Sequence, residues 1–214
     1  RGYRTLDGRR VRQGRVFRTA GLNENAETDA RAPGGYVPGA NRLTQEGLRY
    51  LLGTLGIRSD IDLRSDMECR GMTGSPLGGG VRWFHYSSCQ YEWMQEPEGR
   101  AAFKKVFRVF LDKTNYPIVV HCIAGQDRTG AAAFILNGLL GVPEEDLYRD
   151  WEDTGFWNPA PWFNHTNLFD KLVAGFGRFP GATIQERITN YVLSLGFTKA
   201  DIGRFRDLML EPAD

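Results

Sequence analysis

The fold is decided by the stretch Val119-Val120-His121-Cys122-Ile123-Ala124-Gly125-Gln126-Asp127-Arg128-Thr129-Gly130, which joins two apolar segments. Before it, Pro117–His121 is a run of β-branched residues bounded by proline, typical of a central parallel strand buried on both faces. After it, Arg128–Leu140 has the length and apolar character of a helix. A loop between such a strand and helix wraps around the helix N-terminus, where backbone N–H groups and the helix dipole favour an anion.

The residue types in this loop predict phosphate chemistry. Cys122 stands at the start of the loop, where the surrounding N–H groups favour its thiolate over its thiol. Arg128 follows on the far side and offers a planar fork that matches two oxygens of a phosphate. A thiolate nucleophile, a ring of amides and an arginine together indicate phosphoryl transfer through a covalent cysteinyl phosphate.

Short strands alternate with helices along the chain, which predicts an α/β fold with a mostly parallel central sheet flanked by helices. Residues 1–214 are expected to form a single domain, whose C-terminal part, residues 141–214, is helical. The predicted strands are Arg15–Thr19, Ile57–Leu63, Val81–Tyr86 and Pro117–His121. The predicted helices are Thr44 to Gly56, Arg100–Leu111, Arg128–Leu140, Pro143 to Trp151, Thr183–Leu195 and Lys199–Leu210. Residues 1–20 predict a basic β-hairpin that turns at Asp7-Gly8.

Composition excludes several classes of protein. The chain has 214 residues, of which 41% are hydrophobic and 25% charged, so it can bury a core and is not disordered. The 27 Lys and Arg residues balance the 26 Asp and Glu residues, so no strong field draws the chain to nucleic acid or anionic membranes. The longest apolar runs, such as Ala131–Leu136, are far shorter than a bilayer span, which predicts a soluble protein.

The loop HC-IAGQD-RTG resembles the C-x5-R signature of the cysteine-dependent protein tyrosine phosphatase superfamily. More narrowly, it is similar to the atypical bacterial branch of tyrosine and dual-specificity phosphatases, whose loop reads HCxAGKDRTG. Tyr3–Thr19 resembles that branch's N-terminal hairpin, and Thr44–Ser65 resembles its helix and the strand ending in DLRS. The resemblance implies a phosphatase fold and hydrolysis of phosphate monoesters without a metal or other cofactor. The implied substrate is phosphotyrosine in a protein, or a related small phosphoester.

The resemblance also assigns roles within the loop. Cys122 would be the nucleophile and Arg128 the phosphate clamp, while His121 would orient the loop through its ring nitrogens. Thr129 would donate a hydrogen bond to the Cys122 sulfur and so ease its departure from the phosphoenzyme. The phosphate cradle would be the backbone amides of Ile123, Ala124, Gly125, Gln126, Asp127 and Arg128.

The general acid is open at this point. The leaving group needs a proton from a carboxylic acid within hydrogen-bond reach. The chain has no Trp-Pro-Asp tripeptide, which usually supplies that acid in tyrosine phosphatases. The branch suggests Asp127, whereas Glu92 and Glu96 are alternatives on the loop after Val81–Tyr86. Asp127 could instead be only the partner of a structural ion pair.

Gln126 departs from the branch, which usually has lysine at this position. A neutral amide removes a positive charge near the phosphate and so disfavours highly phosphorylated inositol substrates. Such substrates remain an alternative, because Arg18, Arg64 and Lys104 or Lys105 could supply charge. A phosphate-binding pseudophosphatase without catalytic activity is the alternative from another class, and a rhodanese-like sulfur transferase fits this loop less well.

Other residues allow both a structural and a functional interpretation. Asp62 and Arg64 most simply form a structural ion pair. An aromatic stretch could line a substrate cleft beside Asn158 and Asn164, or only pack in a core; it comprises Trp151, Phe156, Trp157, Trp162 and Phe163.

The three cysteines do not have the spacing of a zinc site and are too few for a disulfide scaffold. Cys69 and Cys89 are expected to be small apolar residues, or one of them a thiol that traps oxidised Cys122 as a disulfide. The chain begins at Arg1 without a methionine, which fits both a removed signal peptide and trimming. The compartment therefore stays open between the bacterial cytoplasm and export.

Overall fold

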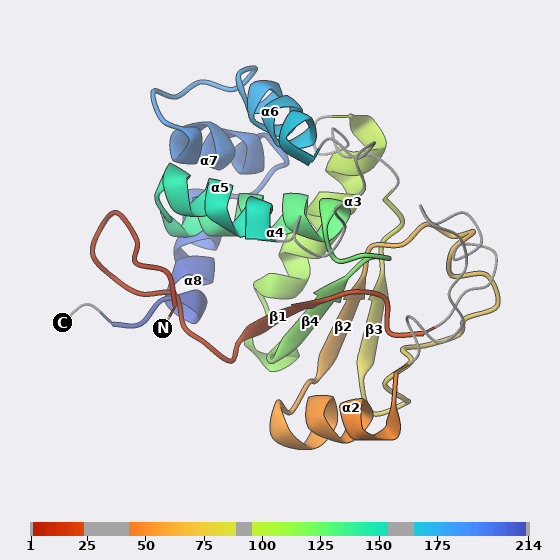
Figure 1. Cartoon of the computed structure of the whole chain (residues 1–214). Helices are drawn as coiled ribbons and strands as arrows, with labels where there is room; N and C mark the ends of the chain where they lie inside the picture. The colour runs from red at the N-terminus through yellow and green to blue at the C-terminus, as the bar shows by residue number, and fades with distance from the viewer. Residues whose placement is uncertain (1, 24–42, 89–95, 154–164, 213–214) are drawn as a thin grey trace. The chain divides into compact units, whose positions relative to one another are not determined.

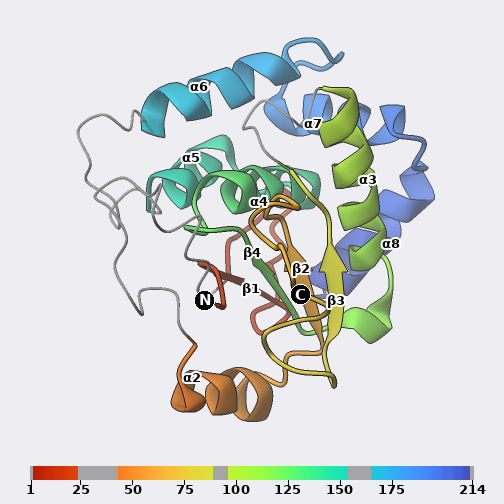
Figure 2. The same ribbon diagram turned by 90° about the vertical axis from the view of Figure 1, so that its right-hand side faces the viewer.

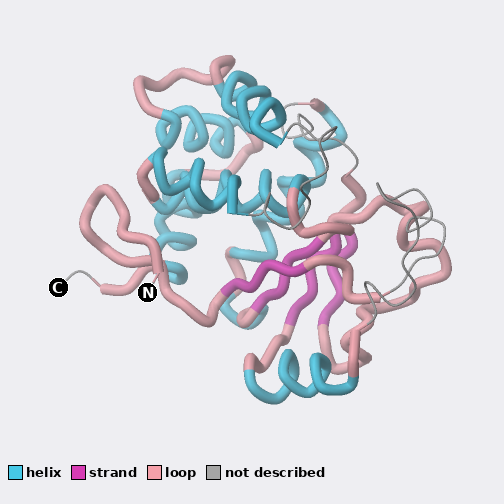
Figure 3. Tube along the Cα trace, viewed as in Figure 1, coloured by secondary structure: helices cyan, strands magenta, loops and turns pink. Residues whose placement is uncertain are grey.

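Four short strands form one parallel sheet in the computed structural model, which describes residues 2–23, 43–88, 96–153 and 165–212. The strands are β1 (Val16–Thr19), β2 (Ser59–Asp62), β3 (Arg82–His85) and β4 (Ile118–His121). Their order across the sheet is β1-β4-β2-β3, and every neighbouring pair is parallel (Figures 1 and 3). The strand β4 thus lies inside the sheet with all four residues buried, which confirms the prediction of a central strand.

The carboxyl ends of the strands meet at one edge of this sheet. The register places Thr19 beside His121, His121 beside Asp62, and Asp62 beside His85. In open parallel sheets, ligands bind outside this edge. The loop of residues 122–128, here called the signature loop, leaves β4 at this edge and leads into α4 (Asp127–Leu140).

One helix covers part of the sheet. The side chain of Thr44 accepts a hydrogen bond from the Gly47 backbone N–H and caps α2 (Gln45–Arg49), as predicted. The helix continues as a π-helical turn, Tyr50–Thr54, and ends before Gly56, whose φ of 64° suits glycine.

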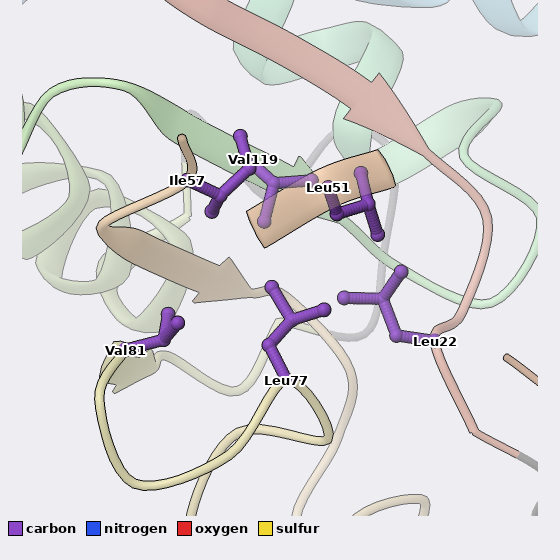
Figure 4. Packing of buried hydrophobic residues seen from close by; sticks show 6 residues of the cluster. All are labelled: Leu22, Leu51, Ile57, Leu77, Val81 and Val119. Carbon is purple, nitrogen blue, oxygen red and sulfur yellow. The ribbon is translucent and has the colours of Figure 1, made fainter. Parts of the chain in front are cut away.

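Six buried apolar side chains pack between this helix and the sheet; they are Leu22, Leu51, Ile57, Leu77, Val81 and Val119 (Figure 4). Burying a side chain of this size contributes about 1.5–3 kcal/mol, so the cluster anchors the helix. Val119 and His121 are two residues apart on β4 and therefore face the same side of the sheet. His121 thus lies on the helix-covered face.

The chain divides into two compact units. The sheet unit consists of Gly14–Cys89 and Thr114–Thr129 and includes all four strands and the signature loop. The helical unit consists of Arg1–Gln13, Gln90–Lys113 and Gly130–Asp214. The fold is therefore α/β, as predicted, while the assignment of one phosphatase domain to residues 1–214 stays a prediction.

The helical unit is held together by aromatic side chains. Its helices are α3 (Pro97–Phe110), most of α4, α5 (Glu144–Asp153), α6 (His165–Phe176), α7 (Ile184–Ser194) and α8 (Lys199–Met209). The helix α6 contacts both α5 and α7 (Figure 2). Phe107 of α3 lies 5.3 Å from Phe205 of α8, centroid to centroid, and Phe103 lies 5.9 Å from Tyr191 of α7. Among the helices within the described residues, none has the length and apolar character needed to cross a bilayer.

The aromatic stretch is only partly described. Trp151 is 1% exposed and packs 5.7 Å from Phe169, so its ring belongs to the core of the helical unit rather than to a substrate cleft. Residues 154–164, which include Trp157 and Trp162, lie outside the described residues.

The predicted N-terminal hairpin is present. Its arms meet in an antiparallel bridge between Arg4 and Arg10, around a turn in which Gly8 has a φ of 85°. The Val11 N–H donates to the Tyr3 carbonyl at 2.9 Å, and Val11 also forms a bridge with Leu210. The following strand was predicted correctly as β1.

Candidate active site

The signature loop is held from outside through its carbonyl groups. Three donors reach three of these carbonyls: Nδ1 of His121 lies 3.2 Å from the Cys122 oxygen, the Gly21 N–H donates to Ile123 at 2.7 Å, and Nη2 of Arg18 donates to Gly125 at 3.3 Å. The C=O and N–H of one trans peptide point in opposite directions. The N–H groups of Ile123, Ala124 and Gln126 are therefore directed away from these partners, toward the inside of the loop. N–H groups turned inward at a helix N-terminus form an anion-binding site.

Gly125 is required by the close approach of the loop to β1. Its φ is 72°, and a Cβ at this position would lie 2.5 Å from the carbonyl oxygen of Thr19. Any other residue would have to displace the end of β1 or the loop itself. The glycine therefore fixes the shape of the cradle.

Cys122 begins the loop directly after β4 and is 2% exposed. The helix α4 starts only five residues later, at Asp127, so its N-terminal dipole acts on the loop. The Thr129 hydroxyl is buried and makes no hydrogen bond within the described part of the chain. The bond from Thr129 to the Cys122 sulfur is thus not formed in this structure and stays a proposal.

Arg128 is held by a carboxylate that the sequence did not reveal. Its Nη1 donates to Oε2 of Glu68 at 2.6 Å, and its Nη2 donates to Oε1 at 3.1 Å. Nη1 also donates to the carbonyls of Leu63, at 3.4 Å, and Ser88, at 3.2 Å. Burial would raise the pKa of Glu68, but the hydrogen bond and charge of Arg128 hold that pKa below its usual value. The guanidinium plane is therefore fixed before any phosphate binds.

A local pattern could have identified Glu68. The Ser65 N–H donates to Oε2 of Glu68 at 2.6 Å, and the Glu68 N–H donates to the Ser65 hydroxyl at 3.3 Å. This is the reciprocal pairing of a capping box, for which Ser-x-x-Glu is the sequence signal. The pattern predicts the turn but not the distant arginine.

Buried polar side chains lie on β2, on β4 and directly after β2. Asp62 accepts hydrogen bonds from Nε and Nη2 of Arg64, at 2.9 and 2.6 Å, and both side chains are fully buried. The predicted structural pair is confirmed, so Arg64 cannot supply charge to a substrate as the sequence allowed. Asp60 and His121 are also fully buried. Throughout the described ranges, no group of three or more His, Cys, Asp or Glu side chains is arranged to hold a metal ion.

One of the two described cysteines, Cys69, is held as a protonated thiol. Both Cys69 and Cys122 are buried thiols. The Cys69 thiol donates to Oδ2 of Asp62 at 3.4 Å, and burial, followed by the negative charge of Asp62, raises the pKa of Cys69 to about 12. A thiol that stays protonated is a poor nucleophile. Cys89, the other candidate for a resolving thiol, lies outside the described residues.

The candidate acids lie on different segments. Asp127 is partly buried and opens α4 next to Arg128. Glu96 is exposed and precedes α3 in the helical unit, and Glu92 lies outside the described residues. The contact between Arg128 and the Ser88 carbonyl shows that the segment after β3 begins at the site. Of the three candidates, Asp127 is therefore the one placed within the signature loop.

A family model described as the tyrosine phosphatase family matches residues 39–173, more than half of the chain. The chain belongs to the tyrosine phosphatase family. A tyrosine-protein phosphatase of Nostoc commune is 27% identical over 135 residues, which cover 48% of this chain and 42% of that protein. The chain therefore spans less than half the length of that relative.

Two solved structures are also similar to this chain. One is the core catalytic domain of the PP-IP phosphatase SIW14 from S. cerevisiae, at 15% identity and a TM-score of 0.41, over 59% of this chain and 74% of that one. The other is TpbA from P. aeruginosa, at 14% identity and a TM-score of 0.45, over 86% of this chain and 88% of that one.

The two hydrogen bonds between Arg128 and Glu68 lead to a first prediction. Glu68→Gln keeps the size of the side chain but removes the charge that fixes the guanidinium. We expect kcat/KM for phosphate monoesters to fall about tenfold, the order seen when an outer partner that orients a binding group is lost. Steady-state kinetics would measure this fall in kcat/KM. The matched control is Asp66→Asn on the same turn, whose side chain is 87% exposed. Equal losses in both variants would contradict the assignment.

Proposed function

We propose that this chain hydrolyses phosphate monoesters through a cysteinyl-phosphate intermediate on Cys122, with phosphotyrosine in proteins as its substrate. The observation that carries the proposal is the structure of the signature loop. Its backbone carbonyls accept hydrogen bonds from groups around the loop, and Arg128 donates two hydrogen bonds to Glu68. Together these leave inward N–H groups and an oriented guanidinium around the cysteine. A site of this kind suits a phosphoryl group with charge on three oxygens.

In the first step, the thiolate of Cys122 attacks phosphorus. The S–P bond forms as the P–O bond to the leaving group breaks. The leaving oxygen takes a proton, and Asp127 supplies it in this proposal. The amides of Ile123, Ala124 and Gln126, with Arg128, hold the charge on the phosphoryl oxygens. The products are a free alcohol or phenol and S-phosphorylated Cys122.

In the second step, water attacks the phosphorus of the phosphoenzyme. Asp127, now a carboxylate, takes a proton from the water, and the S–P bond breaks to release inorganic phosphate. Cys122 leaves as a thiolate. A hydrogen bond from Thr129, once formed, would stabilise that leaving sulfur.

Inositol phosphates are the alternative substrate class. Gln126 is 3% exposed and neutral, so it adds no charge above the bound phosphate. Arg64 is buried against Asp62 and adds none either. The described residues of the signature loop thus offer one guanidinium, Arg128, to a substrate, which favours an ester with a single phosphate.

The test compares hydrolysis of a phosphotyrosine peptide with hydrolysis of inositol hexakisphosphate, with a chelator present. We expect the peptide to be the faster substrate. Asp127→Asn should lower kcat about 100-fold or more on esters with poor leaving groups, and much less on those with good ones, because only a poor leaving group needs the proton. Glu96→Gln is the control acid.

Each contrary outcome identifies an alternative. Faster inositol hexakisphosphate hydrolysis would overturn the substrate assignment but keep the chemistry. A loss of activity in Glu96→Gln or Glu92→Gln, with Asp127→Asn unaffected, would move the acid to the segment after β3. If the wild type binds vanadate or phosphate but hydrolyses neither substrate, the chain is a phosphate-binding pseudophosphatase.

A further inference from the structure

Ser88 lies three residues after β3 and contacts the arginine of the signature loop through its backbone. Its carbonyl oxygen accepts a hydrogen bond from Nη1 of Arg128 at 3.2 Å. The same nitrogen donates to the carbonyl of Leu63, directly after β2, at 3.4 Å. The segments that follow β2 and β3 therefore meet at the guanidinium.

Backbone hydrogen bonds place Ser88 at the carboxyl edge of the sheet. The Leu63 N–H donates to the His121 carbonyl at 2.9 Å, which joins the end of β2 to the end of β4. The Tyr86 N–H donates to the Asp62 carbonyl at 2.9 Å, which joins the segment after β3 to the end of β2. The signature loop follows the first of these ends, and Ser88 follows Tyr86 by two residues. Ligands bind at this edge of a parallel sheet.

The Ser88 hydroxyl has no hydrogen-bond partner among the described residues, although Ser88 is only 5% exposed. Buried hydroxyl groups in proteins nearly always have a partner, because leaving one unpaired away from water costs free energy. The Thr129 hydroxyl, 1% exposed, is also without a partner in the described part of the chain. A residue that contacts Arg128 and the residue that follows it thus both keep an unpaired hydroxyl in the interior.

A bound phosphoryl group would supply the missing partner of Ser88. Its oxygens carry negative charge, and a hydroxyl donates to such oxygens in a short, charge-assisted hydrogen bond. The guanidinium that holds the Ser88 carbonyl has the planar fork that matches two of these oxygens. Because a serine side chain is short, its hydroxyl stays close to its own carbonyl and therefore to Arg128.

We infer that the Ser88 hydroxyl donates a hydrogen bond to an oxygen of the phosphoryl group, so that the segment after β3 completes the phosphate site of the signature loop. The inference rests on the proposed function, because it takes a phosphate ester as the ligand of the loop. Ser88 binds the substrate and does not replace the general acid, since an aliphatic hydroxyl keeps its proton near neutral pH.

The first test measures the binding of inorganic phosphate by isothermal titration calorimetry and needs no hydrolysis. In Ser88→Ala, we expect the Kd of phosphate to rise about 10- to 100-fold, the range for the loss of a hydrogen bond to a charged group. The local control is Ser87→Ala, because Ser87 is exposed on the same segment. This control should bind phosphate like the wild type. An unchanged Kd in Ser88→Ala, or an equal rise in both variants, would overturn the inference.

The second test separates a phosphate contact from a structural role. Urea unfolding is measured without phosphate and with saturating phosphate. Because the Ser88 hydroxyl has no partner to lose, Ser88→Ala should be at least as stable as the wild type without phosphate, and it should gain less stability when phosphate is added. A structural role predicts lower stability without phosphate and an unchanged gain from phosphate, and that result would refute the inference.

Ser59 provides a buried control at the opposite edge of the sheet. Ser59 is fully buried, and its hydroxyl also lacks a partner within the described ranges. It is the first residue of β2, about 10 Å along the strand from the carboxyl end. Ser59→Ala should therefore keep the full gain of stability from phosphate. If it loses as much of this gain as Ser88→Ala does, the effect of Ser88 is not a contact with phosphate.

Kinetics separates this inference from the proposed function. With a phosphotyrosine peptide, Ser88→Ala should lower kcat/KM about 10- to 100-fold, whereas Ser87→Ala should leave it unchanged. If the wild type hydrolyses the peptide and Ser88→Ala is equally active, the inference fails and the proposed function stands. If the wild type binds phosphate but hydrolyses no ester, and Ser88→Ala binds phosphate more weakly, the proposed function fails while Ser88 is confirmed as part of a phosphate site.

Discussion

Cys122→Ser should abolish phosphate-ester hydrolysis while leaving the fold intact. Serine has nearly the same shape as cysteine, but its hydroxyl is a far weaker nucleophile without a general base. His121 does not offer such a base, because its ring is fully buried and its Nδ1 lies 3.2 Å from the Cys122 carbonyl oxygen. We expect kcat to fall about 10^4-fold or more, the order seen when a covalent nucleophile is removed. Steady-state kinetics on a phosphotyrosine peptide would measure the loss.

The matched control is Cys69→Ser. Cys69 is also buried, but its thiol donates to Asp62 and is not part of the signature loop. This variant should keep most of the activity. Circular dichroism and urea unfolding should show that both variants fold. Activity retained in Cys122→Ser, at a level above trace wild-type contamination, would contradict a cysteinyl-phosphate route.

Arg128→Lys should cause the second large loss, about 10^3-fold in kcat/KM, the order reported when an arginine that stabilises transferring phosphoryl groups is removed. The charge is kept, so a loss of this size would come from geometry. The guanidinium is planar and is already fixed by both oxygens of Glu68, whereas an ammonium is a point charge on a flexible stem. We expect weaker inhibition by vanadate as well, because the equatorial oxygens of vanadate, when it binds as a trigonal bipyramid, need the same fork.

Arg82→Lys serves as the control for this substitution. Arg82 lies on β3 in the same unit and is exposed, where Nη1 donates to the Thr114 hydroxyl at 3.2 Å. Its replacement should leave kcat/KM unchanged. If Arg128→Lys behaves like Arg82→Lys, phosphate binding does not depend on a planar fork, and the role given to Arg128 is wrong.

Much of the fold could be predicted because its signals are local. A proline followed by β-branched residues predicted β4, and Thr44 before periodic leucines predicted α2. The N-terminal hairpin was predicted from its turn at Asp7-Gly8. The bridge from Val11 to Leu210 was not predicted, because no local pattern contains a contact between residues so far apart in the sequence.

In the candidate site, too, features that are contiguous in sequence could be predicted, and contacts between distant segments could not. Cys122 and Arg128 could be proposed from the sequence because the strand, loop and helix that position them are contiguous in sequence. The contact of Glu68 with Arg128 was missed because it joins the turn after β2 to the signature loop, 60 residues apart in the sequence. The Thr129 hydrogen bond was expected from resemblance and is not formed in this structure, since its hydroxyl finds no partner in the described residues.

The most direct test of the central claim is to trap the intermediate. The enzyme is mixed with a fast phosphate monoester, quenched within the first turnover, digested and analysed by mass spectrometry under conditions that preserve S–P bonds. We expect a phosphate on the peptide that contains Cys122, and none on the peptide that contains Cys69. The Glu68→Gln variant should accumulate this phosphorylated Cys122 more slowly. Turnover of the substrate with no phosphate on Cys122, or with phosphate on another residue, would contradict the account.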